Sequence, residues 1–365
     1  MPDPAPADHP DRPARSASDP VSLADFEALA AASLRPEILG YYSGAATDER
    51  TLADNLAAFA RWRFVPRLGV EIEGRDTSVS VLGRRWPSPF GVAPMALMKM
   101  ANPAGDVAVA RACAARGLVM TLSTVGTATI EEVGAAGAPS WFQLYLLEDL
   151  GRSRELLARS EAAGYEAIVM TMDAPILGRR ERDVRLGFQL PDGVSYANVR
   201  RSAHRRGDTY GDDGFKQSNT WADLEWVVGN TRLPVIAKGI LHPDDALRAI
   251  QAGAAGIQVS NHGGRQLDGT IAALDALPAV ADAVAGRVPV LFDSGIRRGS
   301  DVLAALALGA TAVFLGRPVL WSLAWAGERG VGMALDMLTA EFRLSLGLAG
   351  QLRADAVSRD LVVRV

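Results

Sequence analysis

A short unit recurs along the chain from about residue 89 onward. Each unit has a brief apolar run, a polar or glycine-containing turn, and an amphipathic stretch rich in Ala and Leu. The apolar runs, which we predict to be strands, cover residues 90–93, 118–122, 141–145, 166–171, 234–238, 256–260, 289–293 and 312–315. Strands that alternate with helices in this way form parallel sheets. Eight of them predict an α/β fold of the closed (β/α)8 type, a TIM barrel.

An open, doubly wound sheet is the alternative fold. Such sheets commonly carry Gly-x-Gly-x-x-Gly where a strand passes into a helix, and this chain has no such motif in the right place. A barrel commonly needs roughly 250 residues, so a chain of 365 residues has room for a barrel with extensions. A composition that is 48% hydrophobic, with 36 glycines, allows a large core and many tight turns.

The region before the first strand divides into two parts. Residues 1–20 hold six prolines among Asp, Arg and Ser, and such a segment cannot bury enough apolar surface to fold. We expect a disordered tail there. Residues 22–64 have a helical pattern in which Ser22 is placed to cap the first helix. The sequence therefore predicts one barrel domain over residues 21–365 with an N-terminal helical extension.

One connection is much longer than the others. About sixty residues separate the fourth predicted strand, which ends near Asp173, from the fifth, which begins near Pro234. Within it, residues 185–218 are rich in Gly, Asp, Arg and Asn. Loops of this length are usually functional lids or disordered segments. We expect a long loop after strand 4 that covers the active-site face of the barrel.

Charge and composition exclude several classes of partner. The net charge of −4 gives no basic surface for nucleic acid or anionic lipid. A single cysteine, Cys113, excludes an internal disulfide and a cysteine-rich metal site, and its small-residue helical surroundings predict core packing. The four histidines are too dispersed for a zinc site. No apolar run reaches the length of a membrane helix and no targeting signal is visible, so we expect a cytoplasmic protein.

Residues 260–269, Ser-Asn-His-Gly-Gly-Arg-Gln-Leu-Asp-Gly, carry the strongest chemical signal. They follow a buried strand, and His262 can exchange a proton there near neutral pH. Arg265 can hold a carboxylate through two parallel hydrogen bonds. The alternative is a glycine-rich turn with a structural histidine and a solvated arginine. The full ten-residue motif is far rarer than His-Gly-Gly alone, so its context favours a functional site.

Polar residues stand at almost every predicted strand end, and in a barrel these ends form the ligand face. Singly, Ser123 or Thr171 is as readily explained as a helix cap. Together the strand ends favour a site, and they carry Pro94-Met95-Ala96, Ser123, Gln143, Tyr145, Thr171, Asp173, Lys238, Ser260, His262, Arg265, Asp293, Arg297, Gly316 and Arg317.

Two subsites can be separated among these residues. The segments 293–299 and 315–318 follow strands seven and eight, where barrels often hold a phosphate on backbone amides and a helix N-terminus. The second subsite combines a base with two guanidiniums and a phenol, and it suits a small anion that loses a proton. Its members are His262, Arg265, Asp173, Arg180 and Tyr145. Asp173 could fix the tautomer of His262, and Lys238 lies between the subsites, where a cation could stabilise negative charge on a ring.

At this point the chain resembles the FMN-dependent α-hydroxy acid oxidases and dehydrogenases, such as glycolate oxidase, lactate oxidase and mandelate dehydrogenase. The resemblance runs from about Ser22 to the C-terminus and so makes residues 21–365 a barrel domain of this family. It is carried by Tyr41-Tyr42, Ala93-Pro94-Met95-Ala96, Phe142-Gln143-Leu144-Tyr145, Thr171-Met172-Asp173, Gly178-Arg179-Arg180-Glu181, Lys238-Gly239, the 260–268 run, the 293–299 run and Gly316-Arg317-Pro318.

The resemblance implies a role for each site residue. FMN is the implied cofactor, with no metal. The catalytic residues would be His262 as base, supported by Asp173, together with Tyr145 and with Lys238, which would face the N1/C2-carbonyl edge of the flavin. Tyr41, Arg180 and Arg265 would bind the substrate carboxylate, and Tyr145 its hydroxyl or keto oxygen. The flavin would contact Pro94, Met95, Ala96, Ser123, Gln143, Thr171, Lys238, Ser260, Asp293, Ser294, Gly295, Arg297, Gly316 and Arg317.

The chain also departs from the family pattern. Ser294 interrupts the usual Asp-Gly-Gly after strand seven. Met95 stands where a threonine is common, and Val125 where an aromatic residue often stands, so substrate specificity cannot be inherited from any one relative. Of two adjacent tyrosines, Tyr41 keeps the family's distance to Asp48 and is the preferred carboxylate ligand.

The resemblance predicts FMN-dependent oxidation of an L-2-hydroxy acid to the 2-oxo acid. His262 would take either the α-proton or the hydroxyl proton, the latter while hydride moves to the flavin. Dioxygen, reduced to hydrogen peroxide, is the expected acceptor because Ala96 is common in the oxidases. A dehydrogenase that uses a quinone or another carrier is the alternative. Two less favoured alternatives are an FMN enzyme like the type 2 isopentenyl diphosphate isomerases and a silent flavin-binding module. A homo-oligomer, a tetramer by resemblance, is also expected.

Overall fold

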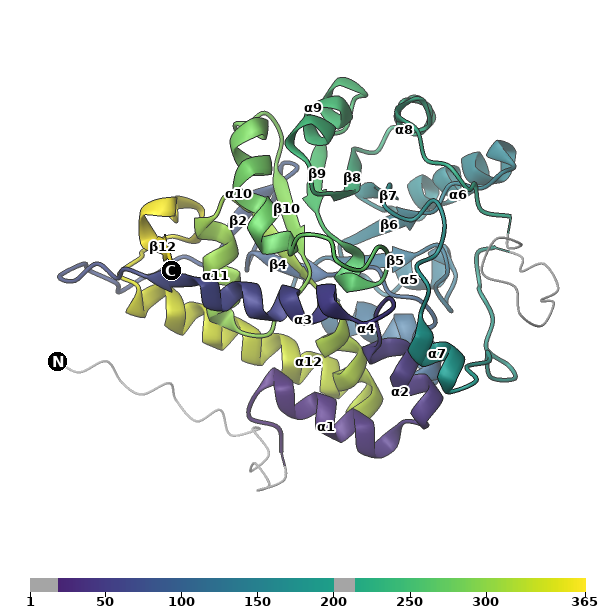
Figure 1. The fold of residues 1–365 in the computed structure, drawn as a ribbon, viewed down its shortest axis with the longest axis horizontal. Coiled ribbons are helices and arrows are strands. Elements are labelled where there is room, and N and C mark those ends of the chain that lie inside the picture. Colours follow the sequence, from purple (N-terminus) through teal and green to yellow (C-terminus); the bar gives the residue numbers. More distant parts are fainter. Residues whose placement is uncertain (1–18, 200–213) are drawn as a thin grey trace.

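The computed structural model describes residues 19–199 and 214–365, and its centre is a closed barrel of eight parallel strands (Figure 1). The strands follow one another around the barrel in chain order, and the last pairs with the first. They are β4 (Phe90–Val92), β5 (Met120–Ser123), β6 (Ser140–Leu144), β7 (Ala167–Thr171), β8 (Val235–Ile240), β9 (Gly256–Val259), β10 (Val290–Asp293) and β11 (Ala312–Leu315). The predicted barrel is therefore confirmed, with each strand within two residues of its expected position.

The barrel strands are buried on both faces, which explains why they read as continuous apolar runs rather than as alternating patterns. Three aromatic rings pack against one another: Trp141 of β6, Phe314 of β11 and Trp86, with centroids 5.4–5.9 Å apart. A hairpin of β2 (Val79–Val81) and β3 (Arg84–Trp86) delivers Trp86. This hairpin was not predicted, because each of its strands is only three residues long.

Helices follow the barrel strands and form the outer layer (Figure 1). They are α4 (Gly105–Ala114), α5 (Ile130–Gly134), α6 (Leu150–Ala162), α8 (Trp221–Gly229), α9 (Pro243–Gln251), α10 (Ala273–Val284), α11 (Gly299–Ala307) and α12 (Arg317–Leu348). His242 caps α9, as its place before a proline suggests, by accepting a hydrogen bond from the backbone of Asp244. Cys113 is fully buried in α4, and burial raises the pKa of its thiol to about 12. Its predicted packing role is confirmed.

The N-terminal extension is helical only up to residue 61. It contains α1 (Leu23–Ser33), α2 (Pro36–Ser43), α3 (Arg50–Ala57) and the 3-10 turn η1 (Ala58–Arg61). The prediction of helix to residue 64 is wrong at its end, because β1 (Trp62–Phe64) pairs antiparallel with β12 (Val362–Arg364) near the C-terminus. At the start of α1, the backbone of Ser22 donates to the Asp25 carboxylate at 2.8 Å. Helix α1 lies along α12 (Figure 1).

The long connection after β7 contains the short helix α7 (Glu181–Arg185), which packs against α2. Residues 200–213 of the predicted lid, like residues 1–18 of the predicted tail, lie outside the described residues. Further 3-10 turns are η2 (Met98–Met100), η4 (His262–Gly264), η5 (Ala354–Ala356) and η6 (Arg359–Leu361). Turn η4 places the most informative sequence motif directly after β9, at the face where ligands bind in barrels.

Candidate active site

A cavity of about 450 Å³ opens at the carboxyl ends of the barrel strands. It is lined by almost all of the predicted site residues: Tyr41, Pro94, Met95, Ala96, Ser123, Gln143, Tyr145, Thr171, Arg180, Lys238, His262, Arg265, Asp293, Ser294, Gly295, Arg297, Gly316 and Arg317. Two predicted residues, Asp173 and Ser260, do not line the cavity. They lie behind it, in contact with residues that do.

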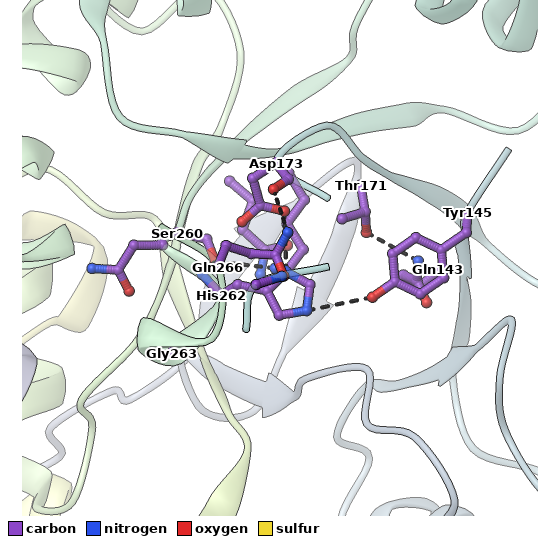
Figure 2. Close-up of polar contacts among 12 residues, drawn as sticks. Gln143, Tyr145, Thr171, Asp173, Ser260, His262, Gly263 and Gln266 are labelled. Carbon is purple, nitrogen blue, oxygen red and sulfur yellow. Dashed lines mark hydrogen bonds and ion pairs between the residues drawn. The ribbon is translucent and has the colours of Figure 1, made fainter. Parts of the chain in front are cut away.

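His262 sits between a carboxylate and a phenol (Figure 2). Its Nδ1 lies 3.1 Å from Oδ1 of Asp173, and its Nε2 lies 3.4 Å from the hydroxyl of Tyr145. A proton on Nδ1 would be donated to Asp173, which leaves the Nε2 lone pair directed toward Tyr145 and the cavity. The backbone of His262 has φ +59°, a left-handed conformation that non-glycine residues adopt mainly where the surroundings enforce it.

The electrostatic surroundings keep His262 neutral and Asp173 charged. Burial lowers the pKa of the His262 imidazole below its ordinary value, against the opposing effect of Asp173. Burial alone would raise the pKa of the Asp173 carboxyl, but the charges of the protonated His262 imidazole and of Lys238 outweigh it, so that pKa lies below its ordinary value. Oδ2 of Asp173 is buried and has no hydrogen-bond partner among the described residues. A neutral imidazole backed by an anion can accept a proton and stabilise the resulting cation.

Ser260 is the centre of a buried hydrogen-bond network. Its Oγ donates to Oδ1 of Asp293 at 2.6 Å and accepts from Nζ of Lys238 and from the backbone of His262, each at 3.0 Å. One hydroxyl has one proton and two lone pairs, so these bonds use its whole capacity. Among the described residues, the side chain of Ser260 therefore links Lys238, Asp293 and the backbone of His262, and its expected contact with a cofactor stays a prediction.

Lys238 is a buried cation at the floor of the cavity. Within the part of the chain that the structure describes, its Nζ makes one hydrogen bond, to Ser260, and lies 3.7 Å from Oδ2 of Asp293. An ammonium group has three donors, so Lys238 retains capacity toward the cavity it lines. The following residue, Gly239, has φ +102°, and a Cβ on it would lie 2.5 Å from the side chain of Asp173. Only glycine at position 239 leaves room for the Asp173 side chain beside β8.

Side chains from three neighbouring strands form a hydrogen-bonded row. Oγ of Ser123 donates to Oε1 of Gln143 at 2.9 Å. Nε2 of Gln143 donates in turn to Oγ1 of Thr171 at 3.0 Å, as Figure 2 shows. Ser123 and Thr171 are the last residues of β5 and β7, and Gln143 is the next-to-last residue of β6, so parallel pairing brings the three side by side. All three are buried and line the cavity. Such a row of donors and acceptors suits the polar edge of a planar ring.

Two arginines meet the ring of Tyr41. The guanidinium of Arg265 lies 5.1 Å from the ring centroid and that of Arg180 lies 5.8 Å from it. The Tyr41 ring also stacks on the ring of Phe188, with centroids 4.6 Å apart. The guanidinium of Arg265 donates hydrogen bonds to the backbone carbonyls of Tyr41 and Gly44, each at 2.8 Å. By contrast, the hydroxyl of Tyr42 donates to the carbonyl of Leu97 at 2.8 Å. The expected carboxylate ligands Tyr41, Arg180 and Arg265 are thus adjacent, and we call them the clamp.

An anion subsite lies where β10 and β11 end. Arg297 and Arg317 form no salt bridge with a described carboxylate, and Arg317 donates three hydrogen bonds to backbone carbonyls out of five donors. A Cβ on Gly316 would meet only the sulfur of Met95, at 3.9 Å, so the start of α12 is open. A Cβ on Gly295 would lie 2.4 Å from the carbonyl oxygen of Asn55. Two cations beside a helix N-terminus favour a phosphate.

Several residues at the site were missed from sequence. Phe188 and Phe215 come from the long connection, where no periodicity marks them. Asn55 lies in the N-terminal extension and contacts Asn261, the neighbour of His262. Asp268 was part of the quoted motif, but its partners were not foreseen: it accepts hydrogen bonds from the backbone of Thr51 and the hydroxyl of Thr47.

This fold and this site are typical of a barrel enzyme that uses a phosphorylated cofactor. The model of the FMN-dependent dehydrogenase family matches residues 30–364, and the chain belongs to that family. It is 43% identical to human 2-hydroxyacid oxidase 1 over 94% of this chain and 96% of the relative. It is 45% identical to L-lactate oxidase of a Nostoc species over 91% and 95%. A solved structure of mandelate oxidase with (S)-4-hydroxymandelic acid superimposes with a TM-score of 0.90 at 44% identity, over 94% of this chain and 99% of that one.

The protein is therefore an FMN-dependent oxidoreductase that acts on the CH–OH group of 2-hydroxy acids. Its cavity fits FMN: the anion subsite matches one phosphate, the Ser123–Gln143–Thr171 row matches a ring edge, and Lys238 supplies a buried cation. Within residues 19–199 and 214–365, no helix has both the length and the apolar character needed to cross a bilayer. In the same residues no group of His, Cys, Asp or Glu side chains is arranged to hold a metal ion.

Proposed function

We propose that this protein oxidises an L-2-hydroxy acid to the 2-oxo acid with His262 as the base and dioxygen as the electron acceptor, giving hydrogen peroxide. The observation that carries the proposal is the alignment of Asp173, His262 and Tyr145 beside the clamp. It joins a proton acceptor to a carboxylate-binding group within one cavity.

Bound FMN supplies the two-electron acceptor for this chemistry. The clamp binds the substrate carboxylate through charge-assisted hydrogen bonds, which places the neighbouring C2 hydroxyl between Tyr145 and His262. Burial raises the pKa of the Tyr145 phenol, so Tyr145 stays protonated and can donate to the substrate oxygen.

Nε2 of His262 accepts a proton from the substrate, either from C2 or from its hydroxyl. Asp173 holds Nδ1 and stabilises the imidazolium that forms. The buried ammonium of Lys238 lines the cavity and would stabilise negative charge on a flavin ring bound there.

Two observations support dioxygen as the acceptor. The similar proteins from human and Nostoc are both named oxidases, and Ala96 lines the cavity at the position where alanine is common among the oxidases that this chain resembles. A homotetramer is also proposed, from the resemblance alone, and a cytoplasmic location stays a prediction from the sequence.

Anaerobic mixing with 2-hydroxy acids tests the proposed reaction. The purified protein should be yellow, and L-2-hydroxy acids should bleach its flavin absorbance while their D-enantiomers do not. A silent flavin-binding module or an isopentenyl diphosphate isomerase would keep its colour with every acid. His262→Gln should keep bound flavin but slow bleaching by roughly 10² to 10⁴-fold, since that is what a positioned base contributes. Near-normal bleaching by this variant would refute the assignment of the base.

A further inference from the structure

We infer that this site selects monocarboxylic 2-hydroxy acids whose side chain is apolar and several carbons long or aromatic. The selecting surface is an apolar wall made by Val125, Leu146, Leu177 and Phe215, which line the same cavity as the clamp and His262. The inference rests on the proposed function, because it takes the substrate carboxylate to lie in the clamp. The side chain that C2 carries, besides its carboxylate and hydroxyl, then faces the part of the cavity near Tyr145 that the clamp does not line.

Phe215 comes from the far end of the long connection and is held in place by backbone pairing. The chain around it forms an antiparallel bridge with Leu147. The backbone of Glu148 donates to the carbonyl of Gly214 at 2.9 Å, and that of Lys216 donates to the carbonyl of Leu146 at 2.8 Å. The Phe215 ring consequently meets the Tyr145 ring edge-on, with centroids 5.6 Å apart. Since Tyr145 contacts His262, Phe215 lies one side chain away from the base.

Val125 is a second member of the wall whose backbone is held in place. It follows β5, and its backbone is fixed by a hydrogen bond from Leu97 to its carbonyl at 3.2 Å and by one to Oγ of Ser123 at 3.3 Å. The side chain is short, so the cavity keeps the volume that a larger residue at this position would fill. A pocket lined by apolar atoms beside the reacting carbon favours a substrate whose side chain is apolar.

The charges around the cavity exclude a second carboxylate on the substrate. Among the described lining residues, Arg180 and Arg265 belong to the clamp, Lys238 pairs with Asp293, and Arg297 and Arg317 belong to the anion subsite. The remaining cation is Lys216. Its Nζ donates to the Asp223 carboxylate at 2.7 Å and to the carbonyl of Ser218 at 3.1 Å. A carboxylate against the apolar wall would therefore be desolvated without a cationic partner, which is costly.

A chain-length series tests the inference. The second-order rate constant for anaerobic flavin reduction would be measured with glycolate, 2-hydroxybutanoate, 2-hydroxyhexanoate, 2-hydroxyoctanoate, 3-phenyllactate and malate, all as L-enantiomers where chiral. Each added methylene that the wall buries should raise the rate constant by roughly fourfold, so hydroxyoctanoate should exceed glycolate by at least a hundredfold. Malate should react more slowly than 2-hydroxybutanoate. Equal rates for glycolate and hydroxyoctanoate, or faster reduction by malate, would overturn the inference.

Phe215→Ala should reduce the hydroxyoctanoate-to-glycolate ratio by roughly tenfold or more, and Phe215→Leu should preserve most of it. Phe188→Ala is the matched control: Phe188 stacks on Tyr41 in the clamp, so its loss should slow all acids by a similar factor and leave the ratio intact. If Phe215→Ala does not fold, Val125→Phe gives the same test by filling the space and lowering the ratio. If the hydroxyoctanoate-to-glycolate ratio is unchanged in both wall variants, the apolar wall does not select the substrate. If no acid bleaches the wild-type flavin, the proposed function itself is wrong.

Discussion

Asn55 and Asn261 pair their side-chain amides reciprocally, each Nδ2 donating to the Oδ1 of the other at 2.8 Å. Both side chains are buried. Asn55 belongs to α3 of the N-terminal extension, and Asn261 immediately precedes His262. The same oxygens also accept from the backbones of Ala273, at 3.1 Å, and Gly264, at 3.3 Å. The extension thus holds the turn in which His262 adopts its left-handed backbone conformation.

Replacing Asn55 with Leu should weaken both folding and catalysis. It leaves the buried amide of Asn261 without its main partner, which costs about 1 to 3 kcal/mol in the free energy of unfolding. It also loosens the turn of His262, so flavin reduction should slow. Urea unfolding and anaerobic stopped-flow measure the two effects. Asn230→Leu is the control, because Asn230, which directly follows α8 in the outer layer, accepts a hydrogen bond from Arg154 of α6 and donates one to the carbonyl of Trp226. Equal reduction rates for Asn55→Leu and wild type would show that the pair has no positioning role.

The pH dependence of flavin reduction should report His262. Because burial lowers the pKa of this imidazole below its ordinary value, which is about 6.5, the neutral base predominates at pH 7. The rate constant at low substrate concentration should therefore be full near neutrality and fall as the pH drops below about 6.5. Asp173 opposes this lowering, so Asp173→Asn should shift the acid limb to still lower pH. That variant should also reduce more slowly by roughly 10² to 10⁴-fold, since the imidazolium loses its anion. An acid limb that moves to higher pH in Asp173→Asn would contradict the assignment.

The clamp should bind a carboxylate and not a neutral group. Arg180→Met removes a charge-assisted partner, for which the expected loss is about 1.5 to 3 kcal/mol, or roughly 10- to 100-fold in substrate affinity. Arg179→Met is a close control, because the Arg179 side chain is 72% exposed and faces Glu181 at 3.7 Å. Titration of the flavin spectrum with a 2-oxo acid or another substrate analogue measures the affinities. Substrate esters that react as fast as the free acids would rule out the clamp.

The cofactor should be released as FMN, because the described residues form one subsite suited to a phosphate, at Arg297 and Arg317. Heating the protein should liberate a flavin monophosphate that chromatography distinguishes from FAD. Arg317→Met should lower flavin affinity by roughly 10- to 100-fold through loss of a partly buried cation at that subsite. Arg298→Met should have little effect, since Arg298 pairs with Glu341 on an exposed surface. Release of FAD from wild type, or unchanged flavin affinity in Arg317→Met, would be inconsistent with this subsite.

Reoxidation decides between an oxidase and a dehydrogenase. We expect the reduced protein to react with dioxygen at least as fast as it turns over in air. Stopped-flow mixing of reduced protein with oxygenated buffer gives the rate, and turnover with a quinone or dye gives the comparison. A much slower reaction with dioxygen than with the artificial acceptor would make the protein a dehydrogenase. The 2-hydroxy acid chemistry would remain as assigned.

The barrel and most of the cavity lining could be predicted from the sequence because their signals are local. A strand buried on both faces is a continuous apolar run wherever it lies, and parallel strands bring their carboxyl ends to one face. His262, Lys238, Gln143 and Arg317 each stand at such an end, so their convergence follows from topology. The composition of the 260–269 motif singled out His262, the base that we propose, before any contact was known.

Tertiary structure alone decided the features that depend on residues far apart in the chain. The pairing of β1 with β12 turned an expected helix end into a strand, because its partner lies about 300 residues away. The Asn55–Asn261 pair and the placement of Phe215 against Tyr145 likewise join segments that no local pattern connects. Ser260 has the side chain of a cofactor ligand, yet Lys238, His262 and Asp293 occupy its hydroxyl. These contacts depend on which side chains and backbone groups compete for the same hydrogen bonds and space. Those groups are far apart in the sequence and meet only when the chain is folded.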